Sequence, residues 1–265
     1  MKRALCIGIN DYPIPDMDLQ GCVNDAKAWA KLLVDNYDFA KPDVSVMLNK
    51  KATKANIVKG IKALFTGARS GDVLVLANSG HGTYVADRSG DEPMYDEAMC
   101  PYDTKDNLIV DDELRELFTA LPRGVRFTFI SDSCHSGSLT RAVPPELTPD
   151  HRKPRFLKPK DIGRRGIAKL ADATSKHPKT FPESGMREIL LSGCRADQFS
   201  FDARFGDKSY GAMTFTALGV IAAAGHDITY AGLRKRLVPA LQAASFDQEP
   251  QVEGTAANKR RVVFT

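Results

Sequence analysis

The run Arg126-Phe127-Thr128-Phe129-Ile130, followed almost at once by Asp132-Ser133-Cys134-His135-Ser136-Gly137, decides how this chain folds. β-Branched and aromatic residues that stop abruptly at small residues are typical of a buried strand that ends in a turn. Val73-Leu74-Val75-Leu76 has the same design and leads into Ser79-Gly80-His81-Gly82. Two such strands, parallel and adjacent, would place the histidine and the cysteine at the same edge of a sheet.

A thiol and an imidazole at one sheet edge suit nucleophilic catalysis. A free thiol with a pKa near ~8.5 is only a few per cent thiolate at neutral pH and needs a nearby base. We therefore expect Cys134 as nucleophile, His81 as base, and the amides of Gly82 and Cys134 as an oxyanion hole worth ~3–4 kcal/mol per donor. Alternatively, Cys134 is a core cysteine and His81 a loop histidine, but the matched strand ends favour the catalytic pair.

Both motifs resemble the histidine and cysteine motifs of the caspase and metacaspase family, in which the histidine lies about 50 residues before the cysteine. The resemblance extends over most of the chain except about 140–187, and is carried by residues 6–12, 21–26, 109–114, 191–198 and 211–216. Asp-Ser-Cys, in place of the Gln-Ala-Cys of animal caspases, points to the bacterial or type I metacaspase side, here without a long prodomain.

Strand and helix patterns alternate along the chain, which is typical of a parallel α/β fold. Six strands are expected, at residues 4–9, 44–48, 73–76, 126–130, 188–192 and 260–263. Helices are expected at about 24–36, after the capping residue Thr53, from Asp111, and near 212–223 and 230–243. The resemblance implies a caspase-like three-layer fold with helices on both faces of a mostly parallel six-stranded sheet. Residues 1–265 would form a single domain, divided into a larger portion (1–139), a linker (140–187) and a smaller portion (188–265).

Composition narrows the class of protein. The chain has 265 residues, 43% of them hydrophobic and 26% charged, and holds no run of 18 apolar residues that could cross a membrane. The apolar run after Met1-Lys2-Arg3 is too short for a signal peptide, so a cytoplasmic location is expected. Five scattered cysteines disfavour a disulfide framework and a zinc site. No cofactor is expected to be required for the chemistry.

Residues 140–187 are basic and rich in proline. They hold twelve Lys or Arg against five Asp or Glu, together with seven Pro, and are expected to form an exposed, mostly non-helical linker. A nucleic-acid arm is disfavoured because interleaved aromatics and a known binding fold are missing. A solvated loop is the simplest interpretation. The resemblance adds a third, because caspase-like enzymes are processed in this region; Arg164-Arg165, before Gly166, is then the preferred site of self-cleavage.

Substrate choice can be argued from charge. The resemblance to metacaspases assigns the first specificity pocket (S1) to Cys22, Asp25, Ser79 and Asp132. Its two carboxylates would favour Arg or Lys at the cleavage position, and Arg can pair with them bidentately. In the alternative interpretation, Asp25 is a helix N-terminal acid and Asp132 a turn former.

Calcium activation is left open by the sequence. Asp96, Asp111 and Asp112 match three ligand positions of calcium-activated metacaspases, and hard cations prefer such oxygens. A fourth acid is expected shortly after the nucleophile, where this chain has Leu139-Thr140-Arg141.

The function predicted from the sequence is that of a cysteine endopeptidase that cleaves protein or peptide substrates after Arg or Lys and processes itself. The alternative is a catalytically silent, caspase-like scaffold or partner-binding module. That alternative would normally show loss of the cysteine, the histidine or the pocket acids, and all of them are present. The sequence does not decide whether a regulatory protein also binds.

Overall fold

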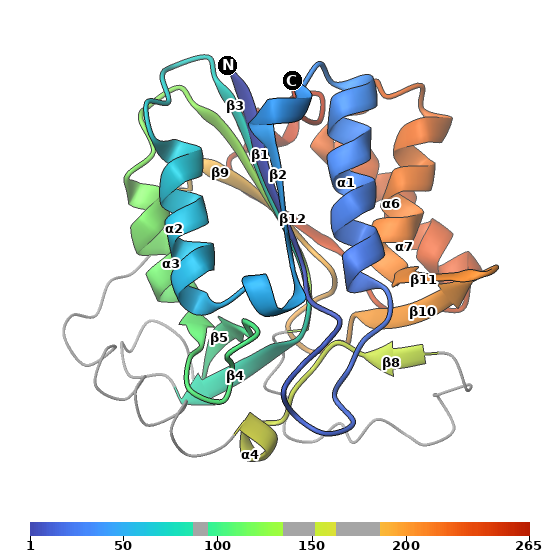
Figure 1. Cartoon of the computed structure of the whole chain (residues 1–265). Coiled ribbons are helices and arrows are strands. Elements are labelled where there is room, and N and C mark those ends of the chain that lie inside the picture. The colour runs from blue at the N-terminus through green and yellow to red at the C-terminus, as the bar shows by residue number, and fades with distance from the viewer. Residues whose placement is uncertain (87–94, 135–151, 163–185) are drawn as a thin grey trace.

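A six-stranded sheet forms the centre of the molecule (Figure 1). The computed structural model describes residues 1–86, 95–134, 152–162 and 186–265. The strands lie in the order β12 (Gln251–Glu253), β9 (Glu188–Ser192), β7 (Arg126–Asp132), β3 (Val73–Ser79), β1 (Lys2–Gly8) and β2 (Val44–Leu48). All neighbours pair in parallel except β12, which is antiparallel to β9. The mostly parallel six-stranded sheet is therefore confirmed.

The prediction of the sixth strand at 260–263 is wrong. Val262 forms only an isolated bridge with Thr229, and the short β12 takes the sixth place in the sheet. The adjacent valines look like a strand because they are β-branched, but Val263 is buried beside the start of a helix, where its N–H donates to Ile228 O. Tertiary packing therefore overrides local propensity here.

Helices cover both faces of the sheet, as expected. On one face lie α1 (Cys22–Asn36), α6 (Ala212–Ala223) and α7 (Tyr230–Ala243), and on the other α2 (Lys54–Phe65) and α3 (Asp111–Thr119) (Figure 1). Thr53 caps α2, because its Oγ1 accepts a hydrogen bond from Asn56 N at 3.3 Å. Shorter helical turns are η1 (Lys41–Asp43), η2 (Asn49–Lys51), α4 (Pro159–Ile162) and α8 (Ala256–Lys259).

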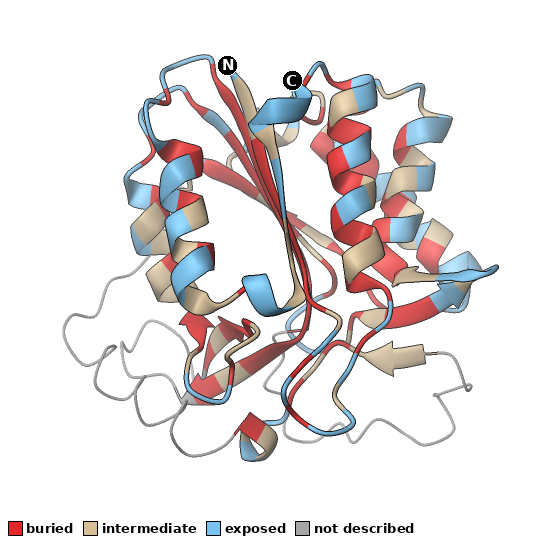
Figure 2. Ribbon diagram, viewed as in Figure 1, coloured by how far each residue is buried: buried red, intermediate tan, exposed pale blue. Residues whose placement is uncertain are grey.

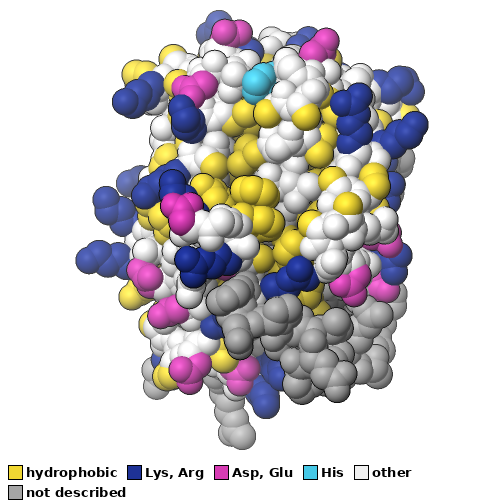
Figure 3. Space-filling view, turned by 90° about the vertical axis from the view of Figure 1, so that its right-hand side faces the viewer, with side chains coloured by type: hydrophobic (Ala, Val, Ile, Leu, Met, Phe, Trp, Pro, Cys, Tyr) yellow, Lys and Arg dark blue, Asp and Glu magenta, His cyan; other side chains and the backbone are white. Residues whose placement is uncertain are grey.

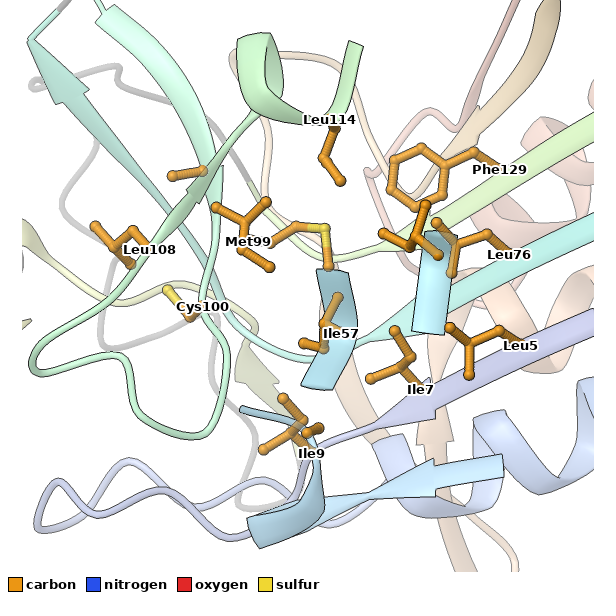
Figure 4. Close-up of a cluster of buried hydrophobic side chains, with 14 of the residues drawn as sticks. Leu5, Ile7, Ile9, Ile57, Leu76, Met99, Cys100, Leu108, Leu114 and Phe129 are labelled. Atoms are coloured by element: carbon orange, nitrogen blue, oxygen red, sulfur yellow. The ribbon is translucent and has the colours of Figure 1, made fainter. Parts of the chain in front are cut away.

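Two cores hold the three layers together, one on each face of the sheet (Figure 2). Side chains alternate along β1, so that Leu5 and Ile7 enter one core and Ala4 and Cys6 the other. Figure 4 shows how the first core is built across the layers. In that view Ile7 on β1, Leu76 on β3 and Phe129 on β7 approach side chains from α2 and α3 that include Ile57 and Leu114.

Two small antiparallel sheets lie at the carboxyl ends of the parallel strands (Figure 1). One contains β4 (Gly82–Ala86), β5 (Tyr95–Met99) and β6 (Ile109–Val110); the other contains β8 (Arg152–Pro154), β10 (Phe201–Phe205) and β11 (Lys208–Gly211). Strand register aligns Gly8, Ser79 and Asp132 side by side at the end of β1, β3 and β7. This edge of the sheet is where the sequence places its reactive residues.

The face on the α6 and α7 side carries a strip of hydrophobic side chains between groups of Lys and Arg (Figure 3). Phe215 of α6 is 42% exposed and stacks on Phe205 with a centroid distance of 3.9 Å. Across the part of the chain that the structure describes, no helix is long and apolar enough to cross a membrane.

Candidate active site

His81 lies just after β3 and is buried. Its Nε2 is 2.7 Å from Met17 O, and because a carbonyl oxygen can only accept, Nε2 carries the proton and Nδ1 is the basic atom. Nδ1 has no hydrogen-bond partner among the described residues. Burial lowers the pKa of His81 to about 3, although the backbone of Met17 and of Arg155 opposes this shift. The imidazole is therefore neutral, with its unprotonated nitrogen at Nδ1.

Tyr12 fixes the position of His81, a role that sequence reasoning missed. Its hydroxyl accepts from His81 N at 2.9 Å and donates to Cys100 O at 3.1 Å, and the two rings are 4.8 Å apart. A Cβ at Gly80 would come within 2.7 Å of this hydroxyl, so only glycine fits there. Tyr12 belongs to the 6–12 stretch of the resemblance, but only the fold brings it against a residue so distant in sequence.

Cys134 directly follows the turn at the end of β7, and its side chain is buried. Its Sγ accepts a hydrogen bond from Ser200 N at 2.8 Å and lies 3.1 Å from Ser200 O. The two amides expected in the oxyanion hole converge on one oxygen: Gly82 N is 3.0 Å and Cys134 N is 3.2 Å from Arg155 O.

The chain's own residues 152–157 pass through this site. β8 pairs antiparallel with β10, Arg155 N donates to Ser200 O at 2.9 Å, and Leu157 N donates to Gly82 O at 2.9 Å. Arg155 and Leu157 are fully buried. The prediction of an exposed linker over 140–187 is therefore wrong for residues 152–157. Their basic and proline-rich composition suggested contact with solvent, but in the structure they bind acidic side chains and backbone groups of the cleft. Arg164 and Arg165 lie outside the described residues.

The guanidinium of Arg155 occupies a closed acidic pocket. Its Nη2 is 2.6 Å from Asp25 Oδ2, and its Nη1 is 2.8 Å from Ser79 Oγ and 3.3 Å from Asp132 Oδ2. Three of the four residues predicted for S1 thus meet around one side chain. Cys22, the fourth, is fully buried, and burial raises the pKa of its thiol although Arg155 opposes the shift, so this side chain is neutral.

Backbone and hydroxyl donors orient the pocket carboxylates. Asp132 accepts from Ser200 Oγ at 2.6 Å, from Thr214 Oγ1 at 2.7 Å and from Thr214 N at 3.0 Å. Asp25 accepts from Gly211 N at 2.9 Å, and a Cβ at Gly211 would come within 2.1 Å of Asp132 Oδ2. Asp25 does lie in the first turn of α1, but its carboxylate is engaged by the pocket.

A third carboxylate, Asp202, was not foreseen from the sequence. Its Oδ2 is 3.9 Å from Arg155 Nη2 and accepts from the amides of Gln20 and Gly21 at 2.9 Å. Three buried acids therefore surround one cation. Burial raises the pKa of Asp25 to about 6, Arg155 counteracts this shift, and Asp132 adds to it. Such a cluster demands a cation, because an unpaired buried charge is strongly destabilising.

The acids proposed for calcium do not form a site by themselves. A cavity of about 270 Å³ is lined by Asp111 and Glu97, whereas Asp96 and Asp112 do not line it. Burial raises the pKa of Glu97 to about 7 and that of Asp111 to about 6. Within residues 1–86, 95–134, 152–162 and 186–265, no group of three or more His, Cys, Asp or Glu could hold a metal ion. The neighbouring acids Asp91 and Glu92 lie outside these residues.

Comparison with known proteins decides the family. The model of the metacaspase, peptidase C14 domain, matches residues 2–142, and Metacaspase-1 of Scheffersomyces stipitis is 30% identical over 305 aligned positions, which cover 99% of this chain and 73% of that protein. The chain belongs to the metacaspase family of cysteine peptidases. Metacaspase-7 of Arabidopsis thaliana is 44% identical over 145 residues, but the match covers 52% of this metacaspase and only 35% of that protein.

Solved structures confirm the caspase-like fold of this metacaspase. Protein GSU0716 from Geobacter sulfurreducens has a TM-score of 0.78 and 28% identity, and the match covers 100% of this chain and 98% of that one. Caspase-1 from Spodoptera frugiperda has a TM-score of 0.58 at 14% identity, with 96% and 86% of the two chains covered, which shows the fold alone.

Proposed function

We propose that this metacaspase is an endopeptidase that cleaves proteins or peptides after Arg, and less readily after Lys, with Cys134 as nucleophile and His81 as base. One observation carries the proposal: the chain's own Arg155 lies in the acidic pocket while its carbonyl oxygen accepts from Gly82 N and Cys134 N. A substrate held for attack by Cys134 would need this same placement of side chain and carbonyl.

The residues of the site support an acyl-transfer mechanism. His81 Nδ1 takes the thiol proton, and Cys134 Sγ attacks the carbonyl carbon of the substrate Arg whose side chain occupies the pocket. The N–H groups of Gly82 and Cys134 stabilise the oxyanion, and the imidazolium returns its proton to the departing amine. Water then hydrolyses the thioester with His81 again as base. Met17 O supports this sequence because it holds the proton on Nε2.

The pocket favours Arg over Lys for a geometric reason. Asp25, Ser79 and Asp132 approach two different guanidinium nitrogens, which a planar fork can satisfy together. The ammonium of Lys is a single point charge and would leave part of this set unpaired. A substrate Asp would add a fourth negative charge and should be rejected.

Self-processing is part of the proposal. With Arg155 in the pocket, Arg155–Phe156 is the first bond presented to Cys134, ahead of the pair Arg164-Arg165. The intact segment also keeps other substrates out, because Arg155 and Leu157 fill the cleft. Calcium remains a proposed activator, with Asp96, Asp111 and Asp112 as the expected ligands.

Mass spectrometry of the purified chain tests self-cleavage after Arg155 and its dependence on calcium. The chain is incubated with and without calcium. We expect fragments 1–155 and 156–265 from the active chain, and no fragments from the Cys134→Ala or His81→Ala variants. Cys6→Ala, at a buried cysteine of the opposite core, serves as the matched control and should still cleave. A panel of fluorogenic peptides with Arg, Lys or Asp at the cleavage position measures specificity. A folded chain that cleaves neither itself nor any peptide would instead be the caspase-like scaffold.

A further inference from the structure

The C-terminal end of α7 presents two carbonyl groups toward the cleft. Ser245 has a φ of +60°, Ser245 N donates to Gln242 O, and Phe246 N donates to Leu241 O, each at 2.9 Å. This is a Schellman turn, in which carbonyls of the last helical turn accept hydrogen bonds from the backbone. The carbonyls of Ala244 and Ser245 are then available to another donor. The negative end of the helix dipole lies at the same place and attracts a cation.

Arg152 fills this position from β8. Its Nη1 is 2.6 Å from Ser245 O, its Nη2 is 3.2 Å from Ala244 O, and its guanidinium carbon lies 4.0 Å from the centroid of the Phe246 ring. Phe246 is itself buried and is packed against Phe201 and Phe205, so its ring is held in place. The contacts are those of a built receptor for a planar cation, with two acceptors and an aromatic face.

The register of β8 shows which substrate residue would make the contact that Arg152 makes here. Arg152 pairs with Ala203 of β10, three residues before Arg155, whose N–H donates to Ser200 O. In a separate peptide that pairs with β10 in the same way, the fourth residue before the cleaved bond would lie on the ring of Phe246. Arg155 and Arg152 therefore mark two separate arginine sites along one strand.

We propose that the carbonyls of Ala244 and Ser245, with the ring of Phe246, form an arginine-binding subsite for the fourth residue before the cleaved bond. The inference rests on the proposed function and deepens it, because the substrate class becomes extended peptides with the pattern Arg-x-x-Arg. Arg should exceed Lys at this position, since Lys can neither pair with both carbonyls nor stack its charge as a plane on the ring.

Peptide kinetics test the subsite. The chain carrying Arg152→Ala and Arg155→Ala removes both anchors of its own segment and opens the cleft to Arg-Lys-Pro-Arg, Lys-Lys-Pro-Arg and Ala-Lys-Pro-Arg on a fluorogenic leaving group. We expect kcat/KM to fall in that order, by about tenfold from the first peptide to the last. Adding Phe246→Leu keeps an apolar side chain but removes the ring; it should reduce kcat/KM most for the first peptide and leave that of the Ala peptide unchanged, whereas Phe246→Tyr should preserve all three values.

Binding provides a measurement that does not depend on turnover. In the same chain with Cys134→Ala added, fluorescence anisotropy of labelled Arg-Lys-Pro-Arg and Ala-Lys-Pro-Arg should give the same order of affinity. Equal affinities and equal kcat/KM values for the two peptides would overturn the subsite while leaving cleavage after Arg intact. Preferred cleavage after a residue other than Arg or Lys would overturn the proposed function instead.

Discussion

At the scale of single residues, Tyr12 supports the backbone of the base, His81. Its hydroxyl joins His81 N to Cys100 O inside a buried site. We predict that Tyr12→Phe lowers kcat about tenfold and leaves KM for Arg peptides nearly unchanged, because His81 loses its support while the acidic pocket stays intact. Each buried group left unpaired costs roughly 1–3 kcal/mol, so the free energy of unfolding should also fall. Steady-state kinetics and urea denaturation would measure the two effects; a change confined to KM would contradict this role.

Asp25 should control the acidic side of the pH profile. Its pKa is raised to about 6 even with Arg155 bound, and Arg155 acts to lower it, so an emptied pocket should titrate at about pH 6 or above. Protonation removes one negative charge from the pocket. We predict that kcat/KM for Arg peptides decreases as pH falls through this range. Asp25→Asn should lower kcat/KM at neutral pH and abolish that limb, and an unchanged profile in the variant would show that another group titrates.

The residues foreseen from the sequence are those carried by local motifs. His81, Gly82 and Cys134 follow strand ends, and the acids of S1 sit in recognisable stretches. Tyr12, Asp202 and Thr214 were missed because their roles depend on contacts between distant segments, such as Thr214 N to Asp132. No local pattern encodes such a pairing.

At the scale of elements, β8 is a strand supplied to the cleft by the chain itself. We predict that Arg155→Ala prevents cleavage after residue 155 and weakens the hold of the segment, because three buried carboxylates lose their cation. This variant should hydrolyse Arg peptides from the first seconds, whereas the natural chain should show a lag until it has cut itself. Arg155→Lys is the conservative control and should cleave slowly. A lag of equal length in all three chains would exclude the segment as its cause.

Elements with strong periodicity were predicted well, including α2 with its Thr53 cap and the parallel strands of the sheet. The strands of the two small antiparallel sheets, β12 and the path of the basic linker were not. β12 has three residues and too short a pattern to be recognised, while the basic linker was assigned to solvent because composition cannot reveal that Arg155 has three acidic partners. In both cases the deciding interaction joins segments far apart in the chain.

At the scale of the whole molecule, a cut after Arg155 should not separate the two products. β9, from the later part of the chain, pairs with β7 along five residues, and α6 and α7 share a core with α1. We predict that fragments 1–155 and 156–265 migrate separately in denaturing electrophoresis but elute together, at the volume of the intact chain, in size-exclusion chromatography. Elution as two smaller species would show that the covalent link holds the halves together.

The placement of Arg155 also sets the molecularity of the first cut. A tethered segment competes at an effective concentration of roughly millimolar, so one copy meets Cys134 at any dilution. The half-life of the uncut chain should then be the same at nanomolar and micromolar protein, whereas cutting between molecules would slow in proportion to dilution. The timing of activation would then be set within each molecule, and it would not depend on how many other copies are present.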